Sequence, residues 1–278
     1  MRKICLFIAF IWTTSVVHAA NEPEMIVVCY PGGSVNTRDA NDAMSSMLRV
    51  VERIGQWQEN GFNSRFTSQT DECRKLMTEY EPKFAITSLG LYLELRKRHN
   101  LLPLVQPRIN GRTSERYRVL AKQGKYNSLD QMQGLSLGGT VLAEPAFIDK
   151  IVFAGQYDLA QHFHLKPSKL AIRTLRSLDK GELDAVILNE QQFSGLSALH
   201  LQSPLEVVFI SADIPLMGVV ANGSATTEEE RARFSLALQH MCSDSEGQKL
   251  CELFGVESFN PVDDAVFEPL FKLWTEGG

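Results

Sequence analysis

The sequence predicts an α/β protein of two lobes, each a mostly parallel sheet flanked by helices. Short apolar runs alternate with segments of helical periodicity over residues 25–105, and the alternation resumes after residue 135. Two polar, turn-rich segments, residues 110–114 and 213–215, separate these blocks, which indicates that the chain crosses between lobes twice. With 278 residues, of which 44% are hydrophobic, the chain is long enough to fill two cores.

Residues 1–19 have the pattern of a secretory signal peptide. Arg2 and Lys3 form a basic start, residues 4–12 are apolar, and a cleavage site is expected near Ala19. No cysteine stands directly after the expected cleavage site, where a lipid anchor would be attached. No later apolar run approaches the length of a membrane span. We therefore expect a soluble exported protein without a lipid anchor.

The charge balance gives no support to nucleic-acid binding. The net charge is −5, and it becomes about −7 when Arg2 and Lys3 leave with the signal peptide. Proteins that bind nucleic acids usually present a basic patch instead.

Four cysteines remain after Cys5 leaves with the signal peptide. An even number in an oxidising compartment predicts two disulfides, and four cysteines allow three pairings. A right-handed crossover from the second strand to the third carries its helix across the first strand, if that strand lies between them. This places Cys73 above Cys29. We therefore predict the pair Cys29–Cys73 and, by exclusion, the pair Cys242–Cys251.

The first lobe is predicted from residues 24–112 and from a return over residues 213–278. Its β-strands alternate with helices that keep apolar residues on one face, which is typical of a parallel sheet. In the return, Thr227 begins a helix, Gly255 ends another, and Asp263 begins the last. We expect its strands at residues 25–30, 62–66, 84–86, 101–105 and 219–221.

The second lobe is predicted over residues 113–212. Ser128 opens a capping box before a short helix, another helix runs from Pro145 to near Gly155, and a third ends at Gly181. We expect its strands at residues 117–121, 135–137, 170–172, 185–188 and 207–210.

A candidate anion site lies where the strand at residues 84–86 runs into a helix through Thr87 and Ser88. The free N–H groups at a helix start and two hydroxyls favour an anion there. The alternative is that both residues merely cap the helix, which this turn alone favours. A second strand-to-turn unit, residues 138–140, has glycines that let the backbone approach a ligand. Such strand ends face a cleft between lobes, where ligands of α/β sheets bind.

The other motifs do not indicate catalysis, metal binding or nucleotide binding. Residues 134–138 match the GxSxG pattern of hydrolases, but Ser136 lies inside a strand that follows a helix, whereas the nucleophile elbow requires a strand and then a helix. The histidines lack the spacing of zinc ligands, and no glycine-rich nucleotide motif occurs. We therefore expect no metal, no cofactor and no enzymatic activity.

The chain resembles the periplasmic solute-binding proteins of the phosphate, phosphite and phosphonate type, a branch of the type II periplasmic-binding (Venus-flytrap) fold. The resemblance implies a periplasmic monomer that captures a small solute between its lobes and delivers it to an ABC permease without catalysis. The stretches that carry it, in chain order, are "KFAITSLGLYLELRKR", "LLPLVQP", "YRVLAKQGKYNSLDQMQGLSLGGT", "LRSLDKGELDAVILNE" and "SEGQKLCELFGVESFNPVDDAVFEPL".

Carried over by position, the resemblance implies ligand contacts from both lobes. Tyr30 either lines the cleft or packs beneath it, and Glu190 faces either ligand or solvent. The set of implied contacts is Tyr30, Ser34, Thr87, Ser88, Gly139, Thr140, Asn189 and Glu190.

The second lobe departs from the phosphonate-binding pattern. Residues 140–145 lack the serine- and threonine-rich helix start of phosphonate binders, and Glu144 would repel an anion or pair with an amine. We therefore expect an anionic or zwitterionic solute. The alternative is an exported sensor domain that acts on a membrane receptor such as a histidine kinase.

Overall fold

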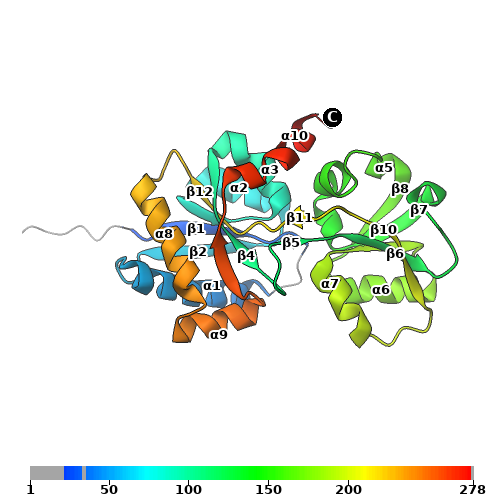
Figure 1. Cartoon of the computed structure of the whole chain (residues 1–278), viewed down its shortest axis with the longest axis horizontal. Helices are drawn as coiled ribbons and strands as arrows, with labels where there is room; N and C mark the ends of the chain where they lie inside the picture. The colour runs from blue at the N-terminus through cyan, green and yellow to red at the C-terminus, as the bar shows by residue number, and fades with distance from the viewer. Residues whose placement is uncertain (1–21, 33–35, 277–278) are drawn as a thin grey trace, which may run out of the picture.

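Figure 1 shows the computed structural model, which describes residues 22–32 and 36–276. The elements form two lobes that lie side by side and are connected in the middle by two segments of chain. The predicted signal peptide, with its cleavage site near Ala19, lies outside the described residues. Within them, no helix combines the length and the apolar character that crossing a bilayer requires.

A six-stranded sheet forms the centre of lobe 1, in the order β13-β4-β12-β3-β1-β2. β1 pairs in parallel with β2 and β3, whereas β12 and β13 run antiparallel to their neighbours. The two strands that follow lobe 2 in the chain, β12 and β13, are therefore antiparallel to the strands that precede lobe 2. The bounds are β1 (Glu24–Cys29), β2 (Phe62–Thr67), β3 (Phe84–Ile86), β4 (Leu101–Arg108), β12 (Val219–Asn222) and β13 (Ser258–Pro261).

Helices cover both faces of this sheet (Figure 1). One face packs against α1 (Thr37–Gly55), α8 (Glu228–Met241) and α9 (Ser245–Phe254). The other packs against α2 (Thr70–Tyr80) and α3 (Leu89–His99), and α10 (Glu268–Glu276) packs on α3. α3 lies against α10 as well as the sheet, so almost all of its first two turns are buried. This burial holds the N-terminus of α3 at the edge that faces the second lobe.

Lobe 2 is built on a five-stranded sheet in the order β10-β6-β9-β7-β8. α6 (Ala171–Lys180) and α7 (Glu190–Ser194) lie on one face, and α4 (Pro145–Phe147) and α5 (Leu159–His162) on the other. The strands are β6 (Arg118–Lys122), β7 (Leu135–Gly139), β8 (Phe163–Pro167), β9 (Ala185–Leu188) and β10 (Leu205–Ile210). Both lobes also contain short helices of other types. The 3-10 helices are η1 (Leu129–Met132), η2 (Val141–Ala143), η4 (Gly195–Ala198) and η5 (Asp264–Val266), and η3 (Ile148–Val152) is a π-helix.

The two connecting segments pair with each other between the lobes. β5 (Ser114–Glu115) runs antiparallel to β11 (Ile214–Pro215), and these short strands contain parts of both segments that the sequence indicates as crossings. Arg116 forms two hydrogen bonds with Asp213, at 2.8 and 2.9 Å, which join the segments a second time.

Three local predictions for lobe 2 are wrong. The strand expected at residues 170–172 lies at residues 163–167, because β8 is an edge strand whose polar His164 and Lys166 break the apolar run. Leu170 instead precedes α6 as its N-cap. Ser128 makes no capping hydrogen bond with its side chain, so the predicted capping box is absent there. The turn expected at residues 138–140 begins later, since Gly138 and Gly139 belong to β7.

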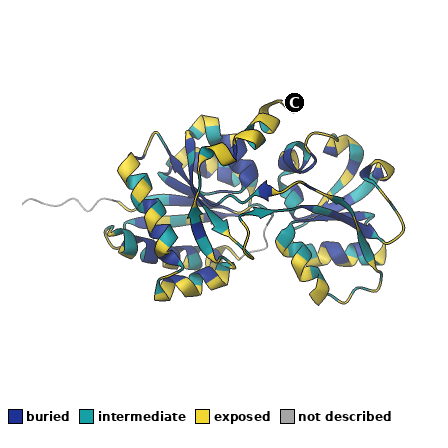
Figure 2. Ribbon diagram, viewed as in Figure 1, coloured by how far each residue is buried: buried dark blue, intermediate teal, exposed yellow. Residues whose placement is uncertain are grey.

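Buried residues form layers on both sides of each sheet (Figure 2). One cluster of buried side chains continues from lobe 1 into lobe 2, because Leu91 and Tyr92 of α3 belong to the same cluster as Phe147 and Ile148. The two lobes therefore share apolar packing on the α3 side.

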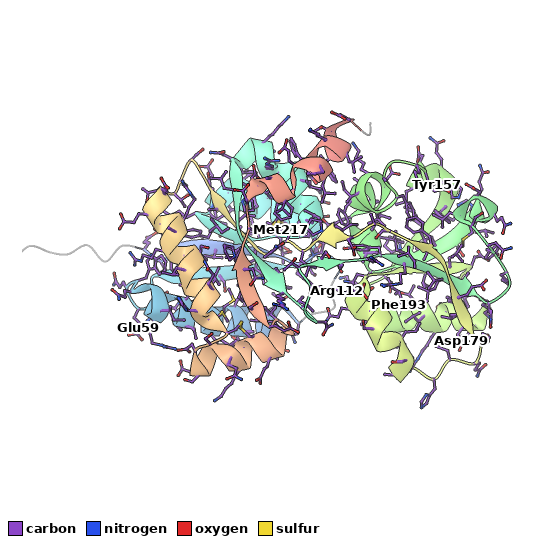
Figure 3. The ribbon with its side chains drawn as sticks, viewed as in Figure 1. Glu59, Arg112, Tyr157, Asp179, Phe193 and Met217 are labelled. Atoms are coloured by element: carbon purple, nitrogen blue, oxygen red, sulfur yellow. A yellow bond between two sulfur atoms is a disulfide. The ribbon has the colours of Figure 1, made fainter. Side chains whose placement is uncertain are left out.

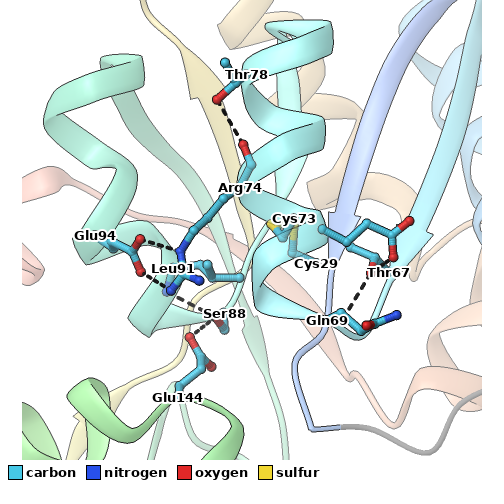
Figure 4. The surroundings of a disulfide bond; sticks show 11 residues. Cys29, Thr67, Gln69, Cys73, Arg74, Thr78, Ser88, Leu91, Glu94 and Glu144 are labelled. Atoms are coloured by element: carbon cyan, nitrogen blue, oxygen red, sulfur yellow. Dashed lines mark hydrogen bonds and ion pairs between the residues drawn. A yellow bond between two sulfur atoms is a disulfide. The ribbon is translucent and has the colours of Figure 1, made fainter.

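The structure contains the two disulfides that the sequence predicts. Cys29 ends β1 and Cys73 lies on α2, with 5.8 Å between their Cα atoms (Figure 4). β1 lies between β2 and β3, so α2 crosses over it as the pairing argument requires. Cys242 and Cys251 connect the end of α8 to α9.

The two disulfides should differ in their effect on stability. Their cysteines are 44 and 9 residues apart, and chain entropy assigns about 4 kcal/mol to the longer loop and about 2.6 kcal/mol to the shorter. Replacing both cysteines of the first pair by alanine should therefore lower the free energy of unfolding more than the same change in the second pair. Urea denaturation of the two double variants measures this difference, and the opposite order would contradict it.

Candidate functional site

A cleft of about 1000 Å³ lies between the lobes and is lined by residues from both. Lobe 1 contributes the end of β1 and the start of α3, lobe 2 contributes Thr140, Glu144 and the start of α7, and the crossing strands form its base. Arg112 and Met217, which Figure 3 labels beside the crossings, also line it. Strands of both sheets thus end at this cleft.

Six of the eight sequence-predicted ligand contacts lie in the lining of this cleft: Tyr30, Thr87, Ser88, Thr140, Asn189 and Glu190. Ser34 lies outside the described residues. Gly139 is not in the lining, since it belongs to β7, and a Cβ there would lie 2.7 Å from Cγ2 of Ile187 on β9. Its lack of a side chain therefore serves packing inside the sheet, and the predicted approach of its backbone to a ligand is wrong.

Ser88 is both a helix cap and a contact between lobes. Its Oγ accepts a hydrogen bond from the N–H of Leu91, at 3.2 Å, as an N-cap of α3 should. The same hydroxyl donates to Oε1 of Glu144 in lobe 2, at 2.8 Å (Figure 4). The capping interpretation of this residue is therefore correct, and it does not exclude a role in the cleft.

Thr87 has a buried hydroxyl without a partner. The residue is only 3% exposed, and its Oγ1 makes no hydrogen bond to any described residue. A buried hydroxyl without a partner costs free energy. Thr87 lines the cleft directly before the start of α3. Its hydroxyl can therefore still form a hydrogen bond at this place.

Glu144 brings a carboxyl group from lobe 2 to the start of α3. Burial raises its pKa to about 7. The hydroxyl of Ser88, the N–H of Leu91 and the charge of Arg74 favour the ionised form and limit the shift, whereas Glu94 adds to it. Arg74 is itself engaged by Glu94, at 2.6 Å. Glu144 has no ion-pair partner among the described residues.

A second carboxyl group lies on the crossing strand β5. Glu115 accepts a hydrogen bond from the hydroxyl of Tyr117, at 2.9 Å, and burial raises the pKa of its carboxyl group. Burial also raises the pKa of Tyr117, and the nearby charges of Glu115 and Glu144 add to this effect. Tyr30 is exposed, and the pKa of its hydroxyl is raised by partial desolvation and by the charge of Glu115. These groups therefore form one cluster of acidic and phenolic side chains in the cleft.

Two of the three arginines that line the cleft, Arg116 and Arg118, are already paired, whereas Arg112 forms no ion pair among the described residues. Arg118 holds Glu190 through two hydrogen bonds, at 2.9 and 3.2 Å, and its guanidinium lies 4.2 Å from the ring centre of Phe193. Arg116 is held by Asp213. Glu190 therefore reaches the cleft, but its carboxylate is directed to Arg118.

The remaining polar groups of lobe 2 are occupied by each other. The side chain of Asn189 caps α7 by accepting from the N–H of Gln192, at 3.0 Å. The side chain of Gln192 in turn donates to Oγ1 of Thr140, at 2.6 Å. These bonds fix the wall of lobe 2 before any ligand enters.

Two glycines allow the lobes to approach closely. A Cβ at Gly90 would overlap Oε1 of Glu144 and lie 2.9 Å from Cβ of Phe147. A Cβ at Gly32, whose φ is +72°, would overlap the backbone oxygen of Thr140. Both contacts join lobe 1 to lobe 2 at the rim of the cleft.

Sequence reasoning missed Glu115, Tyr117 and Arg118. The signal that could have found them is the charged and aromatic run directly after the predicted crossing at residues 110–114. A crossing segment lies at the base of the cleft, so polar side chains that follow it are candidates for the lining.

Comparison with known proteins identifies the family. A family model described as "ABC transporter, phosphonate, periplasmic substrate-binding protein" matches residues 35–267. The chain belongs to this family. A search of the curated proteins found no match.

Solved structures share its fold. A binding protein component of an ABC phosphonate transporter from Pseudomonas aeruginosa has a TM-score of 0.70 at 15% identity, covering 92% of this chain and 87% of that one. A Xanthomonas citri protein bound to ATP has a TM-score of 0.70 at 12% identity, covering 91% and 97%. PhnD1 from Prochlorococcus marinus, in complex with methylphosphonate, has a TM-score of 0.67 at 12% identity, covering 91% and 98%. These likenesses confirm the predicted two-lobed type II periplasmic-binding fold.

Replacing Thr87 by valine should not destabilise the free protein. The change keeps the shape of the side chain and removes a buried hydroxyl without a partner, so we expect the free energy of unfolding to rise by about 1 kcal/mol. Urea denaturation measures it. A marked loss of stability would show that this hydroxyl already has a partner in the free protein.

Glu144 should make stability depend on pH. Its pKa is about 7 in the folded protein against an ordinary value of 4.5, so the folded state holds an extra proton between these values. The contribution of this group to the free energy of unfolding therefore falls as the pH rises through that range. Glu144→Gln removes this contribution, so the variant should gain stability relative to the parent protein from pH 4.5 to 7. Urea denaturation at a series of pH values tests this, and a constant difference would contradict it.

Proposed function

We propose that this substrate-binding protein captures a small zwitterionic solute, with an acid group and an amine, and delivers it unchanged to an ABC permease. It would act in the periplasm as a monomer, after removal of the signal peptide near Ala19. The family match supports the transport role rather than the alternative of a receptor-linked sensor.

The observation that carries this proposal is the charge imbalance of the cleft. Arg116 and Arg118 are neutralised by acidic partners and Arg112 is the one unpaired arginine of the described lining, whereas Glu115 and Glu144 both lack an ion-pair partner among the described residues. Both residues line the cleft, and both carboxyl groups raise the pKa of Tyr117. Both residues are partly buried, and a carboxylate partly removed from water is stabilised by a cation or by hydrogen-bond donors. An amine on the solute would supply both.

The acid group of the solute is assigned to the start of α3. The unpartnered hydroxyl of Thr87 lies there beside Ser88, at the positive end of an 11-residue helix. Solved relatives of this fold carry such ligands: the Prochlorococcus protein holds methylphosphonate, and an ancestral arginine-binding protein with a TM-score of 0.53 holds arginine.

Binding without catalysis agrees with the position of Ser136. Its Oγ donates to Asp184, at 2.7 Å, inside lobe 2, and Ser136 is not among the residues that line the cleft. The GxSxG pattern at residues 134–138 therefore has a structural explanation in the bond between β7 and the segment before β9.

Calorimetric titration with 2-aminoethylphosphonate and with ethylphosphonate tests the proposal, since the two differ only in the amine. A charge-assisted hydrogen bond contributes about 1.5–3 kcal/mol, so we expect the amine to tighten binding by roughly ten- to a hundredfold. Thr87→Val should weaken the binding of both ligands by a similar factor.

The matched control is Thr78→Val, a change of the same size on the exposed side of α2, which should leave both affinities unchanged. Equal affinity for the two ligands, or binding of neither, would contradict the proposed ligand class.

A further inference from the structure

Within residues 22–32 and 36–276, two side-chain hydrogen bonds connect the bodies of the lobes on the α3 side of the molecule. Ser88 donates to Glu144, and Nζ of Lys150 donates to the backbone oxygen of Trp274 on α10, at 3.0 Å. The first of these bonds lies in the cleft itself. Glu144 therefore reaches from one wall of the binding site to the other.

The carboxyl group of Glu144 lies at the start of α3, the place to which the proposed function assigns the acid group of the solute. It accepts the hydroxyl hydrogen of Ser88, and the N–H of Leu91 favours its charge. A helix N-terminus offers these same donors to any anion. Gly90 leaves the space for this carboxyl group, because any side chain there would overlap Oε1. In the free protein, the carboxyl group of Glu144 thus lies at the start of α3 where an anion would bind.

We propose that Glu144 determines the specificity of the cleft: the acid group of the solute replaces its carboxylate at the start of α3, and the displaced carboxylate pairs with the amine of the solute. This rests on the proposed function, and it assigns to one residue the choice between zwitterions and simple anions. A solute without an amine would leave two negative groups close together at one helix start.

The cation whose charge acts on Glu144 is already paired with other carboxylates. Arg74 on α2 faces it but is bonded to Glu94 and Asp71. Glu94 on α3 and Tyr117 next to β5 are the other titratable groups that face it, and neither supplies a positive charge. Protonation of Glu144, whose pKa is raised, would relieve the repulsion of a simple anion.

Glu144 has space to leave Ser88. A second cavity, of about 270 Å³, lies behind it and is bounded by Arg74, Glu94 and Trp274. Glu144 lines both this cavity and the main cleft, so its side chain stands between two open volumes. Its displacement therefore requires no rearrangement of a packed core.

Glu144→Gln is the test, because glutamine keeps the size of the side chain and removes its charge. At pH 8 we expect the variant to bind ethylphosphonate at least tenfold more tightly than the parent protein does, and 2-aminoethylphosphonate at least tenfold more weakly. At pH 6 the advantage for ethylphosphonate should shrink, since Glu144 is then mostly neutral in the parent protein. At each pH, the affinity of the variant is divided by the affinity of the parent protein for the same ligand. Any effect of the ligand's own titration is common to both affinities and cancels.

Two further variants keep the test decisive. Glu79→Gln makes the same change of charge on the exposed side of α2, and both affinities should stay unchanged. Glu144→Asp keeps the charge, and it should keep the preference for the amine. Thermal unfolding of each variant confirms that it is folded.

The outcomes separate the two proposals. Opposite shifts for the two ligands support the role of Glu144. Equal shifts in one direction, or none, would overturn it and leave Glu144 as a contact that only holds the lobes together, while a preference of the parent protein for the amine would leave the proposed function standing. If the parent protein binds neither ligand, both proposals are wrong.

Discussion

The close approach of the two lobes at the start of α3 is the constraint on which the rest of the site depends. Gly90 and Gly32 have no side chain, so Glu144 and the backbone of Thr140 can lie against lobe 1. Packed protein does not tolerate overlap, so a larger residue at either glycine would force the lobes apart. The same approach places Ser88 against Glu144 and continues the apolar packing of α3 into lobe 2.

The charged groups of the cleft divide into those with partners and those without. Arg118 with Glu190 and Arg116 with Asp213 form two-point pairs that hold α7 and the crossing segments in position. Glu115 and Glu144 have no such cation among the described residues. Since an ion buried without a partner is costly, the unpaired carboxyl groups are where a ligand gains most from a positive charge.

Much of the fold could be predicted because the signals are local. Ser88 was placed correctly at a helix start, because an N-cap bonds to an N–H three residues away. The pair Cys29–Cys73 followed from the handedness of one crossover. The strand β8 was missed, because an edge strand does not need the apolar run by which buried strands are recognised. Gly139 was assigned to the ligand, because a sequence does not show which neighbouring strand its backbone will approach.

The sequence by itself determined the two α/β lobes, the crossings between them, the disulfides and the helix start at Thr87 and Ser88. Each depends on periodicity, capping or chain handedness, which act between residues close in the chain or within one repeated unit. Only the tertiary structure decided that Glu144 meets Ser88 from the opposite lobe, 56 residues away, and that Glu115 lines the same cleft with no ion-pair partner in the part of the chain that the structure describes. Charge compensation acts through space, so it depends on how the lobes close.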